Sequence, residues 1–147
     1  MVGMLSAETP CHDKDLPPEL CVTEARSDFG MVATGSAQAT EAAVRILEMG
    51  GNAIDAAVAA AFMLGVVESP SSGIGGVTNI VVHLANGRTT AILGTSYSPT
   101  AIDMESFREF KKSDRTFGYE TISVPTTLAT LEFVRARYGT LELATLL

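Results

Sequence analysis

Tryptophan is absent from this 147-residue sequence, and cysteine, histidine and basic residues are scarce. The two cysteines, Cys11 and Cys21, are too few for a disulfide framework or a cysteine-rich zinc site, and we favour free thiols over a short bridge between them. His12 and His83 lie far apart in the sequence, so neither a metal nor a cofactor is expected. Ten Lys and Arg against 17 Asp and Glu give a formal charge of −7, which argues against nucleic acid as a partner.

A membrane-spanning run and an export signal are also missing. The longest apolar stretch, residues 53–67, carries Asp55 and as a helix would reach about 22 Å, short of the roughly 30 Å hydrocarbon core of a bilayer. Residues 1–20 contain no basic segment followed by an apolar one. We therefore expect no membrane anchor and a cytoplasmic location.

The length is that of one domain, and the pattern predicts a mixed α+β fold. Residues 1–28 are polar, contain prolines and show no periodicity, which predicts a flexible leader. Residues 29–147 carry all the periodic segments and are expected to form the folded part. The last residues, 143–147, are apolar, so we expect the natural sequence to continue beyond them.

Two helices are predicted in the first half of the folded part. The first runs from a Ser36 cap to about Met49, after a short strand at residues 31–34, and Gly50 and Gly51 end it. The second, residues 53–67, is apolar on nearly every side and requires covering layers all round it. The residues of the first helix expected to be buried are Ala39, Ala42, Ala43, Ile46 and Leu47.

A hairpin and a further helix are predicted in the second half. Asn86-Gly87 is the strongest short hairpin signal and separates strands at residues 79–85 and 88–94. A short helix near residues 104–112 and a strand at 121–124 follow. Pro125 then opens a helix over 127–137, with Gly139 past its end and Leu128, Leu131 and Val134 on its buried side.

Local motifs give little chemistry by themselves. The loop containing Gly73, Gly75 and Gly76 could approach a phosphate, but it leaves a helix and enters a strand, so we favour a packed corner. Asp55 could be a catalytic carboxylate with a raised pKa, but a helix cap is the better explanation because the helix N-terminus favours its charged form. Glu68 is expected to be solvated or paired.

Nucleophilic catalysis lacks the usual local signals. No G-x-S-x-G elbow is present, and neither histidine has a recognisable triad partner. The pairs Thr89-Thr90 and Thr126-Thr127 fit strand propensity or helix capping better than a nucleophile.

Two blocks carry a family resemblance. Residues 30–76, GMVATGSAQATEAAVRILEMGGNAIDAAVAAAFMLGVVESPSSGIGG, resemble the opening of the large subunit of γ-glutamyltransferases and related acylases. Residues 122–147, ISVPTTLATLEFVRARYGTLELATLL, are similar to the same family near its VPG turn, with Thr126 where glycine is usual.

The resemblance implies an N-terminal-nucleophile hydrolase, a four-layer αββα sandwich made as a precursor that cuts itself into two subunits. This chain would be the N-terminal part of the large subunit, incomplete by itself, with the remaining large-subunit segments and the small subunit as partners in a heterodimer. The nucleophile, an N-terminal threonine, would lie downstream, so we expect no catalytic residue within these 147 residues. The implied substrate is a small amide or a γ-glutamyl-like compound.

One departure from the family pattern affects specificity. The family usually has an R-E-x-A-P-like turn whose arginine binds the α-carboxylate of the glutamyl donor. Here the turn reads Leu-Gly-Thr-Ser-Tyr-Ser-Pro, residues 93–99, with Thr95 at the arginine position and Ser96 at the glutamate position. We expect Thr95, Ser96 and Tyr97 to bind the acyl group by hydrogen bonds, with an altered acyl-donor specificity.

A second hypothesis remains open from the sequence alone. The chain could be a truncated or degenerate, non-catalytic domain that acts as a subunit or binding partner.

Overall fold

The computed structural model describes residues 27–103, 105, 108 and 121–147. The predicted leader over residues 1–28, with Cys11, His12 and Cys21, lies almost wholly outside the described residues. The chain divides into two compact units, residues up to 73 together with 132–147, and residues 74–131. Each unit is described by itself below.

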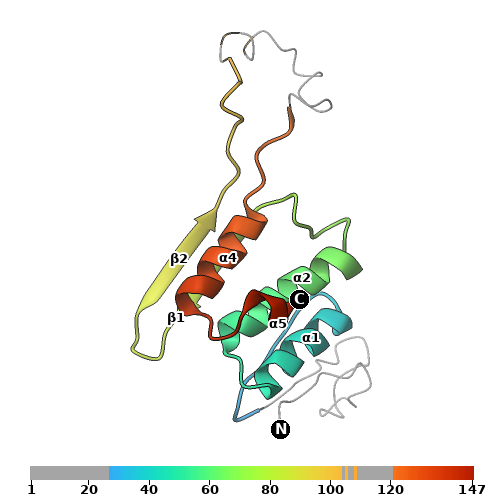
Figure 1. The fold of residues 1–147 in the computed structure, drawn as a ribbon, viewed down its shortest axis with the longest axis vertical. Helices are drawn as coiled ribbons and strands as arrows, with labels where there is room; N and C mark the ends of the chain where they lie inside the picture. The colour runs from blue at the N-terminus through green and yellow to red at the C-terminus, as the bar shows by residue number, and fades with distance from the viewer. Residues whose placement is uncertain (1–26, 104, 106–107, 109–120) are drawn as a thin grey trace, which may run out of the picture. The chain divides into compact units, whose positions relative to one another are not determined.

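The first unit is built on two helices that pack side by side, α1 (Ala37–Glu48) and α2 (Ala53–Val67) (Figure 1). A short helix, α5 (Leu143–Leu146), also contacts α2. Small residues dominate the buried faces, which allows the two long helices to approach closely. The buried residues of α1 are Ala39, Thr40, Ala43, Val44 and Ile46, which confirms three of the five predicted positions.

The end of α1 follows the predicted glycine pair. Gly50 adopts a φ of 91°, a left-handed conformation that favours glycine. The Gly50 N–H donates to the Leu47 carbonyl at 3.1 Å, and the Gly51 N–H donates to the Ile46 carbonyl at 2.9 Å. These two bonds form a Schellman motif, which ends the helix and satisfies two of its last carbonyls.

The start of α1 differs from the prediction in one detail. Ser36 does occupy the position before the helix, and its carbonyl accepts the first helical bond from Thr40. Its hydroxyl, however, donates to the Gln38 side chain at 2.7 Å and makes no capping bond. The predicted cap is therefore right in position and wrong in its side-chain contact.

Helix α2 begins with a complete capping box. The Asn52 side chain accepts hydrogen bonds from the backbone of Ile54 and Asp55, and the Asp55 side chain accepts one from the Asn52 N–H. The predicted capping role of Asp55 is confirmed, and Asn52 shares it. One side of α2 is buried, but Ala57 and Val66 are exposed, so the described chain does not cover this apolar helix on every side.

The second unit contains an antiparallel hairpin of β1 (Thr78–His83) and β2 (Thr89–Gly94). Thr78 pairs with Gly94 at the open end, and His83 pairs with Thr89 at the other. Gly87 has a φ of 83° and donates its N–H to the Leu84 carbonyl, which places it at the left-handed position of the turn. The predicted hairpin is confirmed.

Helix α4 (Thr127–Tyr138) crosses the division between the two units, since Thr127–Leu131 fall in the second and the rest in the first. Its predicted buried side is wrong at Leu128, which is 46% exposed. The buried residues are instead spaced at i, i+3, i+4 and i+7, as on one face of a helix: Thr127, Thr130, Leu131 and Val134.

Two predicted strands are not formed by residues that the structure describes. Residues 31–34 pair with no strand there, and residues 121–124 contribute only an isolated bridge from Val124 to Tyr97. A strand needs a hydrogen-bonded neighbour, which β propensity alone does not supply. The predicted helix over 104–112 lies outside the described residues apart from Glu105 and Arg108.

The mixed α+β class is confirmed by these helices and the two-stranded sheet. Within the described ranges, no helix is long and apolar enough to cross a bilayer.

Candidate functional site

The predicted substrate-binding residues follow β2 directly. Thr95, Ser96 and Tyr97 are all exposed, and Tyr97 exposes 64% of its surface. We call these three residues the acyl-donor turn, after the role that the family resemblance predicts for them. The structure places them on one short segment of the second unit, and residues 93–100 carry no charged side chain.

Gly94 fixes the point at which this turn begins. It is buried, and a Cβ added to it would overlap the hydroxyl of Thr130 and come within 2.5 Å of the Thr78 carbonyl oxygen. Only glycine allows the backbone of β2 to approach α4 this closely. The close approach explains why a glycine stands at the end of the strand.

Thr126 ties the same point to the start of α4. Its hydroxyl donates a hydrogen bond to the Gly94 carbonyl, and its side chain is buried, with 8% of the residue exposed. The N–H groups of Thr126 and Thr127 both donate to the Gly76 carbonyl, at 3.1 and 3.3 Å, and the Thr78 hydroxyl donates to that of Thr127 at 3.3 Å. Threonine side chains and backbone therefore join the hairpin to α4.

The far end of the acyl-donor turn is held by a backbone bridge. The Val124 N–H donates to the Tyr97 carbonyl at 2.8 Å, and the Tyr97 N–H donates back at 3.4 Å. In Figure 1 the segment after β2 and the segment before α4 run side by side, as this bridge requires. Thr95 and Ser96 thus lie between two anchored positions.

The chemistry available at this turn is that of neutral hydrogen-bonding groups. Two hydroxyls and a phenol can donate to and accept from an uncharged ligand, but they cannot neutralise a carboxylate as a guanidinium does. Arg88 precedes β2 at its opposite end, seven positions or about 23 Å from Thr95. No shift of a single residue in register would bring it to Thr95.

Asp55 is the one buried carboxylate among the described residues, and it belongs to the first unit. Burial raises its pKa, but hydrogen bonds outweigh this effect and hold the pKa below its ordinary value. The donors are the Thr140 hydroxyl at 2.7 Å and the backbone N–H groups of Asn52, Thr140 and Leu141. Asp55 is a structural anion with its lone pairs occupied, which supports the capping interpretation.

The contact of Asp55 with Thr140 and Leu141 was not predicted from the sequence. Asn52 reinforces it by donating its side-chain amide to the Tyr138 carbonyl at 2.7 Å. Gly139 lies between these partners, and a Cβ there would come within 2.6 Å of an Asp55 oxygen. The only sequence signal for this contact was Gly139 after the predicted helix, with Thr140 beside it.

The glycine loop is not the packed corner that we predicted. Gly73, Gly75 and Gly76 are exposed, and a Cβ at Gly73 or Gly75 would meet nothing within 4 Å. No steric constraint within the described residues requires glycine at those two positions. Gly76 has a structural role through its backbone, because its carbonyl accepts hydrogen bonds from the N–H groups of Thr126 and Thr127.

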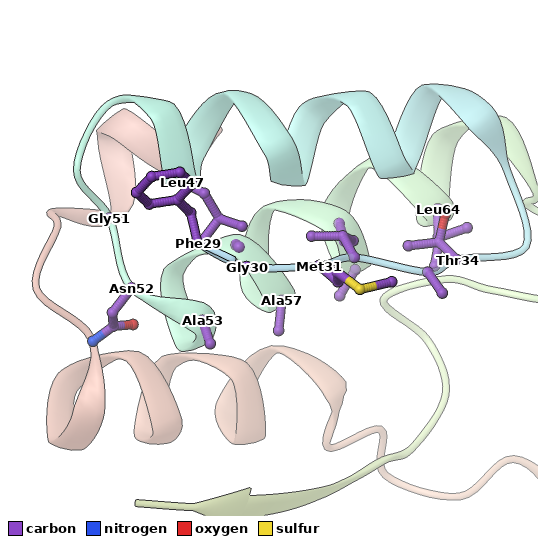
Figure 2. A pocket seen from close by; sticks show the side chains of 15 residues that line it. Phe29, Gly30, Met31, Thr34, Leu47, Gly51, Asn52, Ala53, Ala57 and Leu64 are labelled. Carbon is purple, nitrogen blue, oxygen red and sulfur yellow. The ribbon is translucent and has the colours of Figure 1, made fainter. Parts of the chain in front are cut away.

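Two cavities flank α2 in the first unit. The first, of about 590 Å³, lies between α2 and the extended segment at residues 29–34. Figure 2 shows Phe29 and Leu47 at one end of it and Thr34 and Leu64 at the other, with Met31 between them. The second, of about 670 Å³, is lined by α1, the far side of α2, and residues 145–147. The first cavity has no charged residue in its lining, so it offers a packing surface and no acid or base.

No described residues form a cluster of three or more His, Cys, Asp or Glu that could hold a metal ion. His83 lies on the exposed hairpin, where its Nδ1 is 2.8 Å from the Thr89 hydroxyl.

Comparison with known proteins shows which family this chain is similar to. The family model described as gamma-glutamyltranspeptidase matches residues 39–147. A glutathione hydrolase proenzyme of Pseudomonas sp. (strain A14) is 36% identical over 118 residues, which cover 78% of this chain and 20% of that protein. The Acylase ACY 1 proenzyme of Pseudomonas sp. (strain SE83) is 37% identical over 130 residues, covering 80% of this chain and 23% of the relative.

Solved structures give the same result. The crystal structure of Helicobacter pylori gamma-glutamyltranspeptidase matches with a TM-score of 0.75 and 34% sequence identity, covering 84% of this chain and 36% of the solved one. The chain thus spans about a fifth of the length of the curated relatives and about a third of that solved chain.

Proposed function

The chain belongs to the gamma-glutamyltranspeptidase family, and we propose that it forms the N-terminal part of the large subunit of an amide hydrolase or acyltransferase. The match of the family model over residues 39–147 carries this proposal. The two curated relatives named above are proenzymes, one a glutathione hydrolase and one an acylase. A precursor that cuts itself into a large and a small subunit, which then stay together as a heterodimer, is in keeping with those names.

The nucleophile in this proposal is the N-terminal threonine of the small subunit, which is none of the threonines in these 147 residues. The hydroxyl of that N-terminal threonine adds to an amide carbonyl, while its own α-amine takes the hydroxyl proton and passes it to the leaving amine. Water or an acceptor amine then attacks the acyl ester and releases the threonine. The part of this chain is to bind the acyl group and to support the sheet layers.

The uncovered side of α2 supports a larger, four-layer sandwich. Val66 is 76% exposed, and a cavity lies along each side of the helix, the first of them without a charged residue in its lining. An apolar helix left bare in water is unfavourable at about 25 cal/mol per Å² of apolar surface. We propose that the remaining large-subunit and small-subunit segments cover this surface, and that the assembled protein is cytoplasmic.

The substrate in this proposal is a small amide whose acyl group carries no carboxylate at the glutamyl α-position. By the family resemblance Thr95 stands where an arginine is expected, and the acyl-donor turn itself is neutral throughout. Leaving a buried carboxylate without its cationic partner costs several kcal/mol, on the order of 2–5. The turn therefore favours an acyl group without this carboxylate, bound by Thr95, Ser96 and Tyr97.

Expression of the complete reading frame tests the reaction class. We expect the purified product to separate into two subunits on a denaturing gel and to release p-nitroaniline from simple acyl-p-nitroanilides. A single uncleaved band together with no release from any acyl or γ-glutamyl anilide would contradict the proposal and favour a non-catalytic subunit.

A further inference from the structure

We propose that Thr126 is a positioning residue for the acyl-donor turn, acting through the Gly94 carbonyl to fix the direction in which Thr95 and Ser96 leave β2. This inference rests on the proposed function for its effect on substrate. Its structural part, the ordering of the turn, can be tested without any substrate.

The first support is the bond between Thr126 and Gly94, residues 32 positions apart in the sequence. Both residues are buried, so water does not compete for the Gly94 carbonyl, and a hydrogen bond in such surroundings is stronger than at the surface. Gly94 is the last residue of β2, and Thr95 is the next residue. The hydroxyl of Thr126 therefore acts on the peptide unit from which the turn departs.

The second support is that one short segment holds both ends of the turn. Thr126 binds Gly94, and Val124, two residues earlier, bridges Tyr97 through both of its backbone groups. Thr95 and Ser96 lie between these anchors with exposed side chains. Fixing both ends of a two-residue segment limits its conformations before a ligand arrives, which lowers the entropy lost on binding.

The third support is that the segment is itself fixed to the hairpin. The N–H of Thr126 donates to the Gly76 carbonyl at 3.1 Å, two residues before β1 begins. The hydroxyl of Thr126 thus reaches the end of β2 from a backbone that is anchored near the start of β1. A loss of the hydroxyl should loosen the turn without removing this backbone anchor.

The neighbouring Thr127 provides a matched control. It is the same residue type, it is also 8% exposed, and its N–H also donates to Gly76, but its hydroxyl contacts Thr78 and not Gly94. A substitution of Thr127 by valine removes a buried hydroxyl of equal size from the same junction. Effects specific to Thr126 therefore report on the contact with Gly94.

The structural test compares Thr126→Val, Thr126→Ser and Thr127→Val in the product of the complete reading frame, by hydrogen exchange of the Tyr97 amide. We expect exchange about tenfold faster in Thr126→Val, and rates within twofold of the unchanged protein in the other two. If the valine variant does not fold, Thr126→Gly replaces it, because glycine is the usual residue at this position of the family's VPG turn. Equal exchange in Thr126→Val and Thr127→Val would overturn the proposal.

The functional test measures the hydrolysis of an acyl-p-nitroanilide by the same variants. We expect KM to rise at least fivefold in Thr126→Val with kcat within about twofold, and Thr126→Ser to restore KM. A fall in kcat alone, or the same change in Thr127→Val, would overturn the positioning role. If the unchanged protein splits no amide while Thr126→Val still loosens the turn, the proposed function fails and the structural inference stands.

Discussion

The carboxylate of Asp55, at the start of α2, accepts a hydrogen bond of 2.7 Å from the hydroxyl of Thr140, which follows α4 in the sequence by two residues. The two residues are 85 positions apart, and Asp55 is fully buried. Burying a charge is costly unless it is fully hydrogen-bonded, and here the backbone N–H groups of Asn52, Thr140 and Leu141 complete the shell. The residue fixes the end of α4 to the start of α2 within the first unit.

Replacing Asp55 by alanine should destabilise the protein by about 3 kcal/mol, because it removes a helix cap and leaves several buried donors without an acceptor. Urea unfolding followed by circular dichroism measures the change. Glu41→Ala is the control, since its ion pair with Arg45 at 2.5 Å is exposed and should contribute less than about 1 kcal/mol. Equal losses of stability in the two variants would show that the buried network of Asp55 stabilises the protein no more than an exposed ion pair does.

Stability should depend on pH through Asp55 with a defined sign. Its pKa in the folded protein lies below the ordinary value near 4, so the stabilisation is fully present above that value and is lost as the pH falls through the lower folded value. The difference in unfolding free energy between the unchanged protein and Asp55→Asn should be constant from about pH 5 to 7 and shrink below about pH 4. A difference that grows as the pH falls would mean a raised pKa and would contradict this account.

Gly139→Ala should destabilise the protein by about 1–3 kcal/mol, because the new Cβ would come within 2.6 Å of an Asp55 oxygen and 2.7 Å of the Arg135 carbonyl. Gly75→Ala is the matched control, since a Cβ there meets nothing within 4 Å. It should change stability by less than about 0.5 kcal/mol or increase it slightly. Thermal unfolding of the two variants measures the difference. A larger loss of stability in Gly75→Ala than in Gly139→Ala would contradict this prediction.

Local signals were enough to predict α1, α2, α4 and the hairpin, but they did not predict the short helix α5. Asn52 with Asp55 three residues later is a capping box that can be recognised in the sequence, and Asn86-Gly87 marks the turn. The bond from Thr140 to Asp55 could not be predicted, because nothing near either residue specifies a partner 85 positions away.

The buried side of α4 shows a second limit. Three-residue spacing of apolar side chains favoured Leu128, but Gly94 brings the backbone of β2 against Thr130, and the threonine side is the one that is buried. Which face of α4 is buried depends on its tertiary contact with β2, and the spacing of apolar residues in the sequence does not predict that contact. The same holds for the candidate site, where Thr95, Ser96 and Tyr97 could be named from the resemblance but their anchors at Thr126 and Val124 could not.

Thr95→Arg should move acyl-donor preference toward γ-glutamyl compounds. A guanidinium at this position can bind a carboxylate through two hydrogen bonds, so kcat/KM for γ-glutamyl-p-nitroanilide should rise at least tenfold. Thr89→Arg, which adds the same charge at the other end of β2, should leave it within about twofold. An equal response in both variants would assign the effect to net charge and not to the acyl-donor turn.

The most direct measurement compares two substrates that differ only in the α-carboxylate. The product of the complete reading frame is assayed with γ-glutamyl-p-nitroanilide and with 4-aminobutyryl-p-nitroanilide. We expect kcat/KM for the second to equal or exceed that for the first, because the neutral turn has no cation to bind the carboxylate. A preference of a hundredfold or more for the γ-glutamyl compound, equivalent to about 2.7 kcal/mol of transition-state binding, would contradict the account.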